Sequence, residues 1–525
     1  MEADNFQTTT EVFLSWLAKM GIQISPKIAV ADLRTSGKNR GVVAITDIEE
    51  DEVLFTIPRS AALNMNTALS DSQLSFLQKT IPDVPGWLAL TTIMLVEALR
   101  KDSKWMPYFA VLPELLDSLV FWADDELSEL QASMVTTKIG KATAEDLFAQ
   151  HITPLNIENA NPTMCHKVAS VIMAYAFDIP ELVDKENAEG QDEEADELVS
   201  DNGEDEKTIL SMIPLADMLN ADADRNNSRL CCDNEDLEMR AIRPITKGDE
   251  IFNDYGQLPR SDLLRRYGYV TDNYAPFDVA ELSTESIMSL FRSDESLQLP
   301  GQKVLEPLGL SEVNKRIELS QREGKPTFSE EISSFPLGTE SLKSSDAPGT
   351  FYSPLGSAWN RNTDTKNLGI GIYEDSYDLA HPGPDGPSIP DELLALLYIL
   401  LLDDEHFAAI QTSETALPSR SRLSTELVGQ VLVKLLQLRE QEYATTAEED
   451  EALLQAGNLP HRKAMAVQVR FGEKQVLRQA IQEATTFAAS NKRMRGQAKV
   501  REAVAGGTKR KVHQTEGEKK KVRKR

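Results

Sequence analysis

The chain has 525 residues, of which 41% are hydrophobic, and its formal net charge is −29. This length allows two or more domains, each with an apolar core, and the apolar share excludes a mostly disordered chain. An acidic body attracts basic partners and repels nucleic-acid phosphates, so we expect no specific nucleic-acid binding, although such charge also serves simply to keep a surface soluble.

The first third of the sequence alternates between helical and strand-like patterns. Apolar residues recur at i, i+3, i+4 and i+7, which predicts an amphipathic helix within residues 1–23: Phe13, Trp16, Leu17 and Met20. Short β-branched runs separated by glycine and charged turns follow from residue 28 and predict a small β-meander that ends at Pro58. Helical patterns, including one over residues 124–135, then predict a helical region over about 62–180.

The middle of the chain changes character twice. Residues from about 181 to 207 are acidic with almost no apolar content, which predicts a solvated or disordered loop. Strand-like segments and a short helix return and continue to about residue 275. We therefore expect an α+β domain over residues 24–275.

The last part of the chain is predominantly helical in pattern. Spacings of four, four and three residues predict a long helix with one apolar face: Leu427, Val431, Leu435 and Leu438. We expect a helical domain over residues 276–495, interrupted by a Ser-, Gly- and Pro-rich loop over 328–390. A basic, low-complexity tail occupies residues 496–525 and is predicted to be disordered.

Two features bear on the compartment. The N-terminus is acidic where a secretory signal is basic. The longest apolar stretches, 87–99 and 393–402, are well short of the roughly 20 residues that span a bilayer, and we interpret both as buried helices. We expect no membrane embedding, and the small number of cysteines fits a reducing compartment.

Metal ligation is not expected from the cysteine and histidine content. The chain has three cysteines, Cys165, Cys231 and Cys232, without a Cys-x-x-Cys spacing or the number needed for a disulfide framework. Its six histidines include no His-Glu-x-x-His pair. We therefore expect neither a structural nor a catalytic metal.

Three segments that are far apart in sequence are candidates for one site. The first, 37–44, is a glycine-bearing turn between strands, where glycine permits a ligand to approach the backbone. The second contains Asp217 and Asn220, which share a face if the segment is helical. Each has an ordinary alternative: most such turns merely join strands, and Asp and Asn are common in turns and caps.

The third segment is rich in tyrosine. Tyr255 and Tyr267 each precede a glycine, and Tyr269 follows two residues after Tyr267. Three tyrosines at the end of a strand and its following helix can line a narrow channel. Taken one at a time, each is better explained as an ordinary core aromatic beside a loop glycine.

The combination and order of these segments resemble the SET-domain lysine methyltransferases of the Rubisco large-subunit methyltransferase type. The similarity runs from about Phe13 to Tyr274 and continues more weakly into a helical substrate-binding region. It implies a β-rich SET domain with a helical insertion and a knot-like crossing of its closing motifs. The matching segments are GKNRGVVAITDIEEDEVLFTIP, KWMPYFAVLPELLDSLVFWADDELSEL, PLADMLNADAD and FNDYG with LLRRYGYV.

The resemblance also implies roles for individual residues. Tyr255 falls on the family's active-site tyrosine, while Tyr267 and Tyr269 correspond to the aromatic wall of the substrate channel. The family's motif continues Asn-His, and because Ala221 replaces that histidine we expect weaker cofactor affinity. The residues implied to bind S-adenosylmethionine are Asn39, Arg40, Gly41, Tyr175, Asp217, Asn220, Tyr255 and Tyr269.

The activity that the resemblance implies is methylation of a lysine side chain in a basic protein, with a large-subunit ribosomal protein as the expected substrate. Methyl transfer from a sulfonium to an amine is an in-line displacement that depends on alignment. The lysine must first lose a proton, and an apolar aromatic channel favours the neutral amine. A neutral thioether leaves, so the reaction needs no Lewis acid.

Two other classes of protein remain to be weighed. A SET-fold scaffold or methyl-lysine binder without activity is favoured by Ala221 and disfavoured by Tyr255 and the paired Tyr-Gly motifs. A Rossmann methyltransferase would need Gly-x-Gly-x-x-Gly after a strand, and Gly369 to Gly371 lacks the third glycine and lies in a loop-rich stretch.

The C-terminal tail predicts a nuclear protein. Residues 492–525 hold 14 lysines and arginines against three glutamates, which leaves a net −40 for the rest of the chain. Two clusters, 509–511 and 519–525, resemble a bipartite nuclear import signal that the import machinery would bind. A solubilising or RNA-contacting tail is the alternative, and passage through the cytoplasm is compatible with either.

Overall fold

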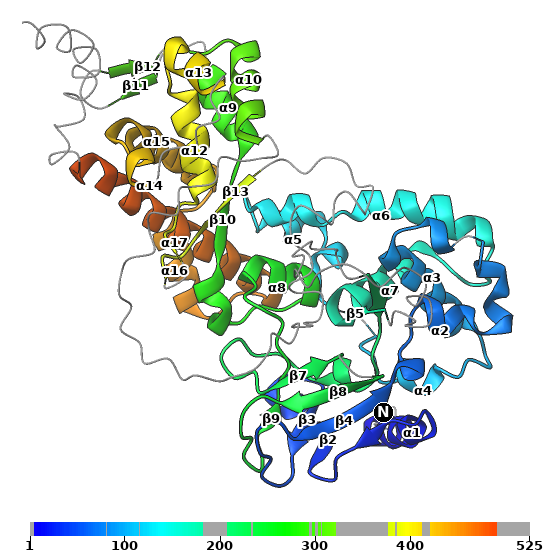
Figure 1. Ribbon diagram of the computed structural model, residues 1–525. Coiled ribbons are helices and arrows are strands. Elements are labelled where there is room, and N and C mark those ends of the chain that lie inside the picture. The colour runs from blue at the N-terminus through cyan, green and yellow to red at the C-terminus, as the bar shows by residue number, and fades with distance from the viewer. Residues whose placement is uncertain are drawn as a thin grey trace, which may run out of the picture. The chain divides into compact units, whose positions relative to one another are not determined.

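The chain forms two compact units in the computed structural model (Figure 1). Of the described residues, those up to Asp278 and Leu453–Val469 form unit 1, and those from Val279 to Ala452 and from Arg470 onward form unit 2. The structure describes residues 5–79, 81–114, 116–181, 207–232, 235–292, 297–299, 303–305, 307–321, 376–383, 386–411 and 420–490. The predicted acidic loop, apart from its ends, and the predicted basic tail lie outside the described residues.

Among its described residues, unit 1 has three small antiparallel sheets. One has the order β1-β4-β8-β7, the second β2-β3-β9, and the third pairs β5 with β6. The strands are β1 Gln23–Ile24, β2 Ile28–Asp32, β3 Arg40–Ala44, β4 Val53–Pro58, β5 Phe177–Pro180, β6 Thr208–Ser211, β7 Ser228–Cys231, β8 Asp236–Ala241 and β9 Glu250–Ile251. The predicted β-meander therefore divides between two sheets, because β2 and β3 pair with β9 whereas β4 pairs with β8.

The helices of unit 1 surround these sheets. They are α1 Phe6–Lys19, α2 Met65–Leu69, α3 Gly86–Leu99, α4 Met106–Phe109, α5 Asp124–Ser128, α6 Lys141–Leu147, α7 Pro162–Tyr175 and α8 Arg260–Tyr267. The apolar stretch 87–99 forms α3, and its residues 88–97 are buried on all sides, including Thr91, Thr92 and Glu97. The predicted helix over residues 124–135 is too long, because α5 has only five residues and ends at Ser128.

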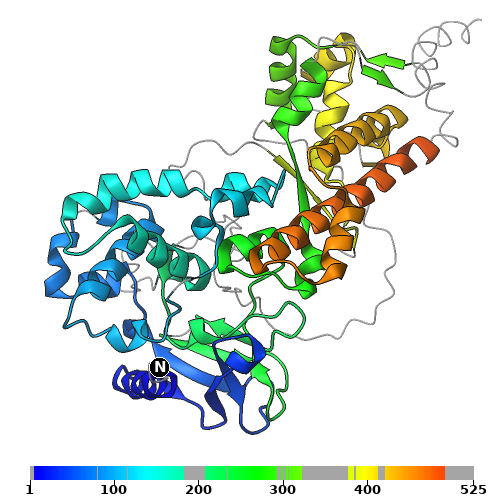
Figure 2. The same cartoon turned by 180° about the vertical axis from the view of Figure 1, so that it is seen from behind.

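Aromatic side chains join α1 to α4, which lie side by side in both views of the ribbon (Figures 1 and 2). Trp16 stacks on Tyr108 with ring centroids 6.1 Å apart, and Phe13 stacks on both, at 5.9 Å from Trp16 and 6.3 Å from Tyr108. The predicted N-terminal apolar face is therefore buried, except that Met20 is partly exposed. Burying three large aromatic rings fixes α4 in place, with consequences for the site below.

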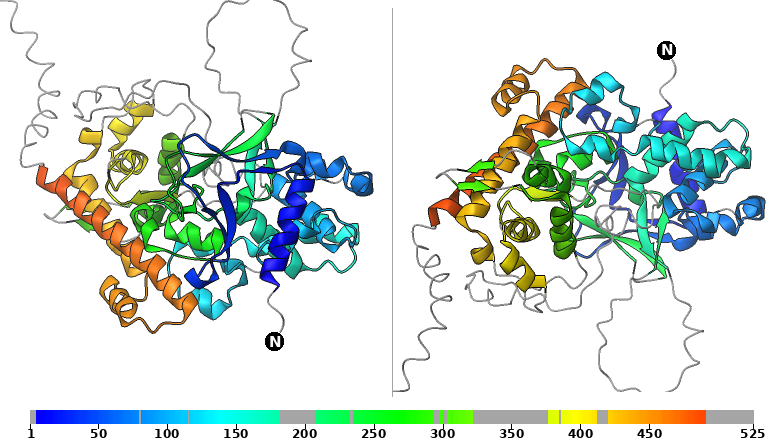
Figure 3. Two further views of the ribbon diagram at one scale, coloured as in Figure 1. Left: turned by 90° about the horizontal axis from the view of Figure 1, so that it is seen from below. Right: turned by 90° about the horizontal axis from the view of Figure 1, so that it is seen from above.

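Unit 2 is mostly helical, with two strand pairs among its described residues, β10–β13 and β11–β12. Its longest described helix, α17, runs unbroken for 30 residues and begins in unit 1 (Figure 3). The elements are β10 Val279–Ser283, α9 Thr284–Arg292, β11 Leu297–Leu299, β12 Lys303–Leu305, α10 Leu310–Gln321, β13 Ser376–Ala380, α12 Asp391–Leu400, α13 Asp404–Gln411, α14 Arg420–Leu423, α15 Glu426–Gln441, α16 Ala447–Ala456 and α17 His461–Ser490.

Three features of the C-terminal half differ from the sequence-based expectations. Strand β13 lies within the stretch 328–390 that was expected to be loop, because it pairs with β10 over five residues. The buried face of α15 includes Val431 and Leu435 but not Leu438, which is 37% exposed. Residues 453–469 group with unit 1, where Met465 and Val469 pack on a cluster that contains Trp122.

Neither a membrane span nor a metal cluster is found in the part of the chain that the structure describes. No helix there has the length and apolar content to cross a bilayer. Likewise, the described residues contain no group of three or more His, Cys, Asp and Glu side chains that could hold a metal ion.

Candidate functional site

Gly41, at the start of β3, allows two distant segments to approach the backbone of the first candidate segment. A Cβ atom placed there would lie 2.5 Å from Cδ1 of Leu33 and 3.0 Å from both Nδ2 of Asn220 and Oε1 of Glu250. Contacts this close leave no room for a larger residue without movement. The glycine therefore lies where chain segments separated by about two hundred residues converge, and a larger residue there would displace the side chain of Leu33, Asn220 or Glu250.

Asn220 joins the first and second candidate segments. Its side-chain amide donates two hydrogen bonds from Nδ2, one to Oε1 of Glu250 at 2.7 Å and one to the carbonyl of Arg40 at 3.3 Å. Its backbone carbonyl accepts from the amide of Asn253 at 2.9 Å, and Ala221 forms a parallel bridge with Asn253. The second segment is thus tied to the strand that leads into Tyr255.

Glu250 was not identified from the sequence, although it connects all three segments. Its carboxylate accepts from Asn220 through Oε1 and pairs with Nζ of Lys38 through Oε2 at 2.5 Å, and its side chain is 14% exposed. The Lys38 ammonium lies 4.5 Å from the centroid of the Phe252 ring. We name Lys38, Gly41, Asn220 and Glu250 the junction.

Two residues of the first segment contribute to the junction mainly through their backbone. The Arg40 guanidinium donates to Thr10 at 3.0 Å and to Thr9 at 2.8 Å, and it lies 4.0 Å from the centroid of the Phe6 ring, so its side chain is directed to α1. The exposed Asn39 accepts from the amide of Leu33 through its carbonyl, which closes the turn. Both backbones remain adjacent to Gly41.

Asp217 and Asn220 have different partners rather than one shared face. The short 3-10 helix Ala216–Met218 ends before Asn220, and it follows Leu215, whose φ of +78° is unusual for a branched residue. Buried Asp217 accepts a hydrogen bond from the Tyr108 hydroxyl. Burial raises the pKa of Asp217 to about 7, although the Tyr108 hydrogen bond opposes this shift.

The tyrosines gather into one cluster. Tyr255 and Tyr267 stack with ring centroids 4.2 Å apart, and Tyr269 meets Tyr267 edge-on at 6.3 Å. Burial raises the pKa of Tyr255 well above its ordinary value, and the nearby Tyr267, Tyr175, Tyr269 and Tyr274 add to the shift. We name these five residues the tyrosine cluster. Its hydroxyls stay neutral at physiological pH, as donors and acceptors rather than anions.

Two hydroxyls of the tyrosine cluster are buried without a hydrogen-bond partner. Those of Tyr267 and Tyr274 contact no donor or acceptor within the described ranges. An unsatisfied buried hydroxyl is costly, so it needs either compensation or an incoming polar group. Tyr175 is half-buried and lies near Asp217. Burial and the negative charge of Asp217 raise the pKa of Tyr175 to about 12.

Gly268 fixes the turn between Tyr267 and Tyr269. Its φ is +75°, and a Cβ there would lie 2.6 Å from the carbonyl carbon of Asp117 and 2.8 Å from the amide nitrogen of Ser118. Glycine is the residue that accepts both the left-handed backbone and this contact. The second Tyr-Gly motif is therefore a packing requirement as well as a turn.

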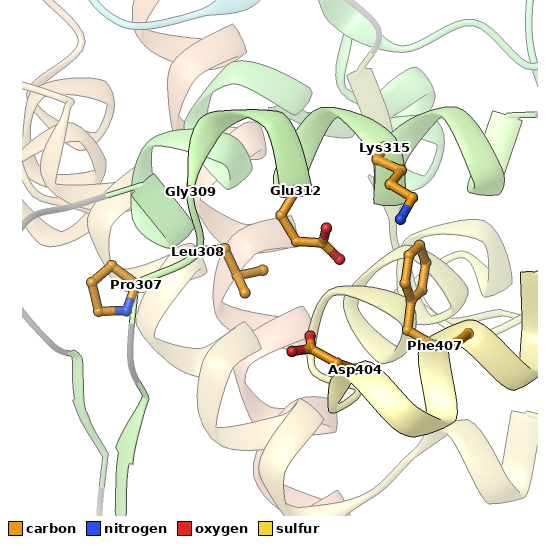
Figure 4. Close-up of a pocket in the computed structure, with 8 residues that line it drawn as sticks. Pro307, Leu308, Gly309, Glu312, Lys315, Asp404 and Phe407 are labelled. Atoms are coloured by element: carbon orange, nitrogen blue, oxygen red, sulfur yellow. The ribbon is translucent and has the colours of Figure 1, made fainter.

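Two hollows lie away from the tyrosine cluster, and neither was expected from the sequence. A cavity of about 390 Å³ in unit 1 adjoins the junction and is lined by Lys38, Arg225, Asn227, Arg243, Pro244, Ile245, Asp249, Glu250 and Phe252. A cavity of about 350 Å³ in unit 2 lies between α10 and α13, where Glu312 and Asp404 face each other and Lys315 lies beside the ring of Phe407 (Figure 4). Both carboxylates there already pair with Arg316, which disfavours this second hollow as a cation site.

The fold and the junction define a SET domain, and comparison with known proteins agrees. The SET domain family matches residues 39–256, and the Rubisco LSMT substrate-binding family matches residues 357–477. The chain belongs to the SET-domain proteins of the Rubisco large-subunit methyltransferase type, which confirms the resemblance and the predicted α+β class.

Named relatives and solved structures support this assignment. Ribosomal lysine N-methyltransferase 4 of Saccharomyces cerevisiae is 36% identical over 309 residues, covering 55% of this chain and 61% of the relative. N-lysine methyltransferase setd6 of Xenopus laevis is 33% identical over 49% of this chain and 56% of that protein. The corresponding protein of Xenopus tropicalis is 30% identical, and 71% of its length is covered.

The solved structures share the fold at low sequence identity. The SET domain of LSMT bound to lysine and AdoHcy gives a TM-score of 0.60 at 17% identity, with 92% of each chain covered. Rubisco LSMT bound to AdoMet gives 0.59 at 17% identity, again with 92% of each chain covered.

Proposed function

We propose that the protein transfers a methyl group from S-adenosylmethionine to a lysine side chain of a basic protein. The observation that carries this proposal is the convergence of the junction with the tyrosine cluster. Asn253 bonds Asn220 and Ala221 and precedes Tyr255 by two residues. Relatives named as lysine N-methyltransferases match about half of this chain, and the SET domain family matches residues 39–256, which include Asn220, Asn253 and Tyr255.

The residues present fit such a cofactor. The backbones of Asn39, Arg40 and Gly41 and the side chain of Asn220 would hold it, with Tyr175 and Asp217 beside them. The buried Tyr267 and Tyr274 hydroxyls have no partner in the described part of the chain, as expected for groups that await a polar ligand. When bound, S-adenosylmethionine supplies an electrophilic methyl group on a sulfonium.

The tyrosine cluster can then prepare the lysine. Its aromatic, water-poor surroundings favour the neutral amine over the ammonium, because burial penalises the charged form. The Tyr255 hydroxyl remains protonated, since burial raises its pKa, so it can orient the amine without adding charge. Weak C–H···O contacts from tyrosine hydroxyls and backbone carbonyls would align the methyl for in-line attack.

Replacement of the family's histidine by Ala221 favours one rival, a SET-fold scaffold or methyl-lysine binder without activity. The backbone of Ala221 is nevertheless held by its bridge to Asn253, so contacts made through the backbone do not require the histidine. The test is incubation with methyl-labelled S-adenosylmethionine and basic ribosomal proteins, comparing wild type with Tyr255→Phe. We expect label on lysine with wild type and much less with the variant; no transfer by either, together with no cofactor binding in calorimetry, would favour the scaffold.

The substrate class we propose is a large-subunit ribosomal protein. Two observations support it: the relative named ribosomal lysine N-methyltransferase 4, and the net −40 of the chain without its tail, which attracts basic proteins. A histone or transcription-factor tail would suit the same electrostatics. Mass spectrometry of ribosomes from cells that lack the protein should show the loss of a methyl-lysine; an unchanged methyl-lysine map would contradict the assignment.

We also propose that the protein enters the nucleus through residues 509–525. The support is the pair of basic clusters in the sequence, since these residues lie outside the described ranges. A fluorescent fusion of the full chain should concentrate in the nucleus, and a fusion in which the lysines and arginines of both clusters are alanine should not. Equal nuclear signal from the two fusions would contradict the import role.

A further inference from the structure

We infer that Glu250 is a positioning residue that fixes the orientation of the Asn220 amide, so that its carbonyl oxygen accepts a hydrogen bond from the α-ammonium group of S-adenosylmethionine. The inference rests on the proposed function and adds a residue that acts through Asn220. Glu250 lies on β9, whereas Asn220 follows the 3-10 helix Ala216–Met218. The two side chains meet only because the chain folds back on Gly41.

The hydrogen-bond partners of Asn220 determine which way its amide points. Both partners of Nδ2, the Glu250 carboxylate and the Arg40 carbonyl, can only accept hydrogen bonds. If the amide turned over, Oδ1 would face two acceptors and two bonds would be lost. The orientation with Nδ2 toward Glu250 is therefore strongly preferred.

In this orientation the carbonyl oxygen Oδ1 of Asn220 is available to accept a hydrogen bond from a ligand. Within the described residues no group donates a hydrogen bond to Oδ1 of Asn220, and its side chain is only partly buried. A carbonyl oxygen accepts but does not donate, so a ligand must offer a donor. The α-ammonium of the cofactor is such a donor, and a bond between a charged donor and a carbonyl is stronger than a neutral one.

Lys38 supports this arrangement by occupying the other carboxylate oxygen of Glu250 at 2.5 Å. The pairing offsets the negative charge of Glu250 and prevents the carboxylate from turning away from Asn220. Both oxygens of Glu250 thus have a partner, and the ammonium of a ligand is directed to Asn220 rather than to Glu250 itself.

The test compares the binding of S-adenosylhomocysteine and its deamino analogue by calorimetry, using the full chain. In wild type we expect the analogue to bind about tenfold or more weakly, the factor associated with one hydrogen bond to a charged group. In Glu250→Gln the single side-chain oxygen is expected to stay with Lys38, so the new NH2 faces Asn220 and can donate to Oδ1 of a turned amide, against the longer bond of Nδ2 to the Arg40 carbonyl at 3.3 Å. The ratio of the two dissociation constants should then fall toward one. Asn220→Ala should give the same loss.

A matched control separates positioning from general damage to the sheet. Glu238 also lies on a strand of unit 1, is 19% exposed and pairs with Arg240 at 2.6 Å, but it belongs to another sheet. We expect Glu238→Gln to keep the wild-type ratio. We also expect Glu250→Gln to raise the KM for S-adenosylmethionine about tenfold while kcat at saturating cofactor changes about twofold or less, because the lost interaction is one of binding.

The outcomes distinguish the inference from the proposed function. A wild-type ratio near one, or a ratio in Glu250→Gln equal to that of wild type, overturns the role of Glu250 while S-adenosylhomocysteine binding still supports the proposed function. Failure of wild type to bind S-adenosylhomocysteine overturns both. If Glu250→Gln does not fold, the wild-type ratio and the Asn220→Ala ratio decide the question.

Discussion

The junction and the tyrosine cluster both lie in unit 1, and they differ in how their polar groups are satisfied. In the junction, the side-chain donors and acceptors of Glu250 and Lys38 are satisfied by residues from other segments. In the tyrosine cluster, the hydroxyls of Tyr267 and Tyr274 are buried without a partner among the described residues. Apart from Oδ1 of Asn220, the junction is therefore held together by contacts among the described residues, whereas two hydroxyls of the tyrosine cluster have no partner there.

Because of this difference, we expect the two regions to contribute to different steps of the reaction, namely cofactor binding and methyl transfer. Residues that fix the backbone and amide of the junction should affect how tightly the cofactor binds. Residues of the tyrosine cluster should affect the chemical step, because their interactions form with the reacting groups. Variants of the two regions with the same effects on cofactor affinity and on kcat would contradict this distinction.

Tyr255→Phe is expected to have the largest effect. The phenyl ring retains the stacking on Tyr267 at 4.2 Å, so only the hydroxyl is lost. We expect kcat to fall about 100-fold, as when one polar group that acts on the transition state is removed. Stopped assays at saturating substrates measure kcat, and calorimetry should show an unchanged dissociation constant for S-adenosylhomocysteine. A variant with normal kcat and weakened cofactor binding would reverse the assignment of the two regions.

Asp217 is buried near Tyr175 of the tyrosine cluster, and its contribution to stability should depend on pH. Its pKa in the folded protein is about 7, above the ordinary 3.8, because of burial. The folded state binds the proton more tightly, so this contribution is fully present below about pH 4 and is lost as the pH rises through 7.

We expect Asp217→Asn to remove the pH dependence of this contribution to the free energy of unfolding. Relative to the variant, wild type should lose about 2 kcal/mol of unfolding free energy between pH 5 and pH 8. Urea unfolding at the two pH values measures the difference. An equal gap at both pH values would show that Asp217 is not protonated near neutral pH in the folded protein.

Gly41→Ala tests the junction itself. The added Cβ would meet Leu33, Asn220 and Glu250 at 2.5 to 3.0 Å, so the Asn220 amide must shift. We expect the dissociation constant of S-adenosylhomocysteine to rise about tenfold, which corresponds to about 1.4 kcal/mol of overpacking and misplacement. Gly86→Ala is the matched control, since nothing lies within 4 Å of its added Cβ. Unchanged affinity in Gly41→Ala would show that the junction does not position the cofactor.

Tyr267→Phe should have the smallest effect on stability. Its hydroxyl makes no hydrogen bond with the described residues, so removing it should leave the free energy of unfolding unchanged or higher by up to about 1 kcal/mol. Chemical denaturation checks this, with Tyr443→Phe as the contrasting control because the Tyr443 hydroxyl donates to Glu473 at 2.6 Å. A clear loss of stability in Tyr267→Phe would mean that its hydroxyl has a partner in the unliganded protein.

The sequence predicted the fold class and the order of the site segments, because those depend on local patterns and on family motifs. It did not predict Glu250, Lys38 or Tyr108. The hydrogen bond between Tyr108 and Asp217 joins residues 109 positions apart, and such a pairing leaves no periodic trace in either segment. Packing between distant segments also decides which face of a helix is buried. The helix α15 was predicted correctly, but Leu438, which was expected on its buried face, is exposed.

A crystal structure of the protein grown with S-adenosylhomocysteine tests the central claim most directly. The account predicts the ligand against the backbone of residues 39–41 and the side chain of Asn220, with its sulfur facing the tyrosine cluster. Density for the ligand at another surface, with the junction and the cluster unchanged, would contradict it.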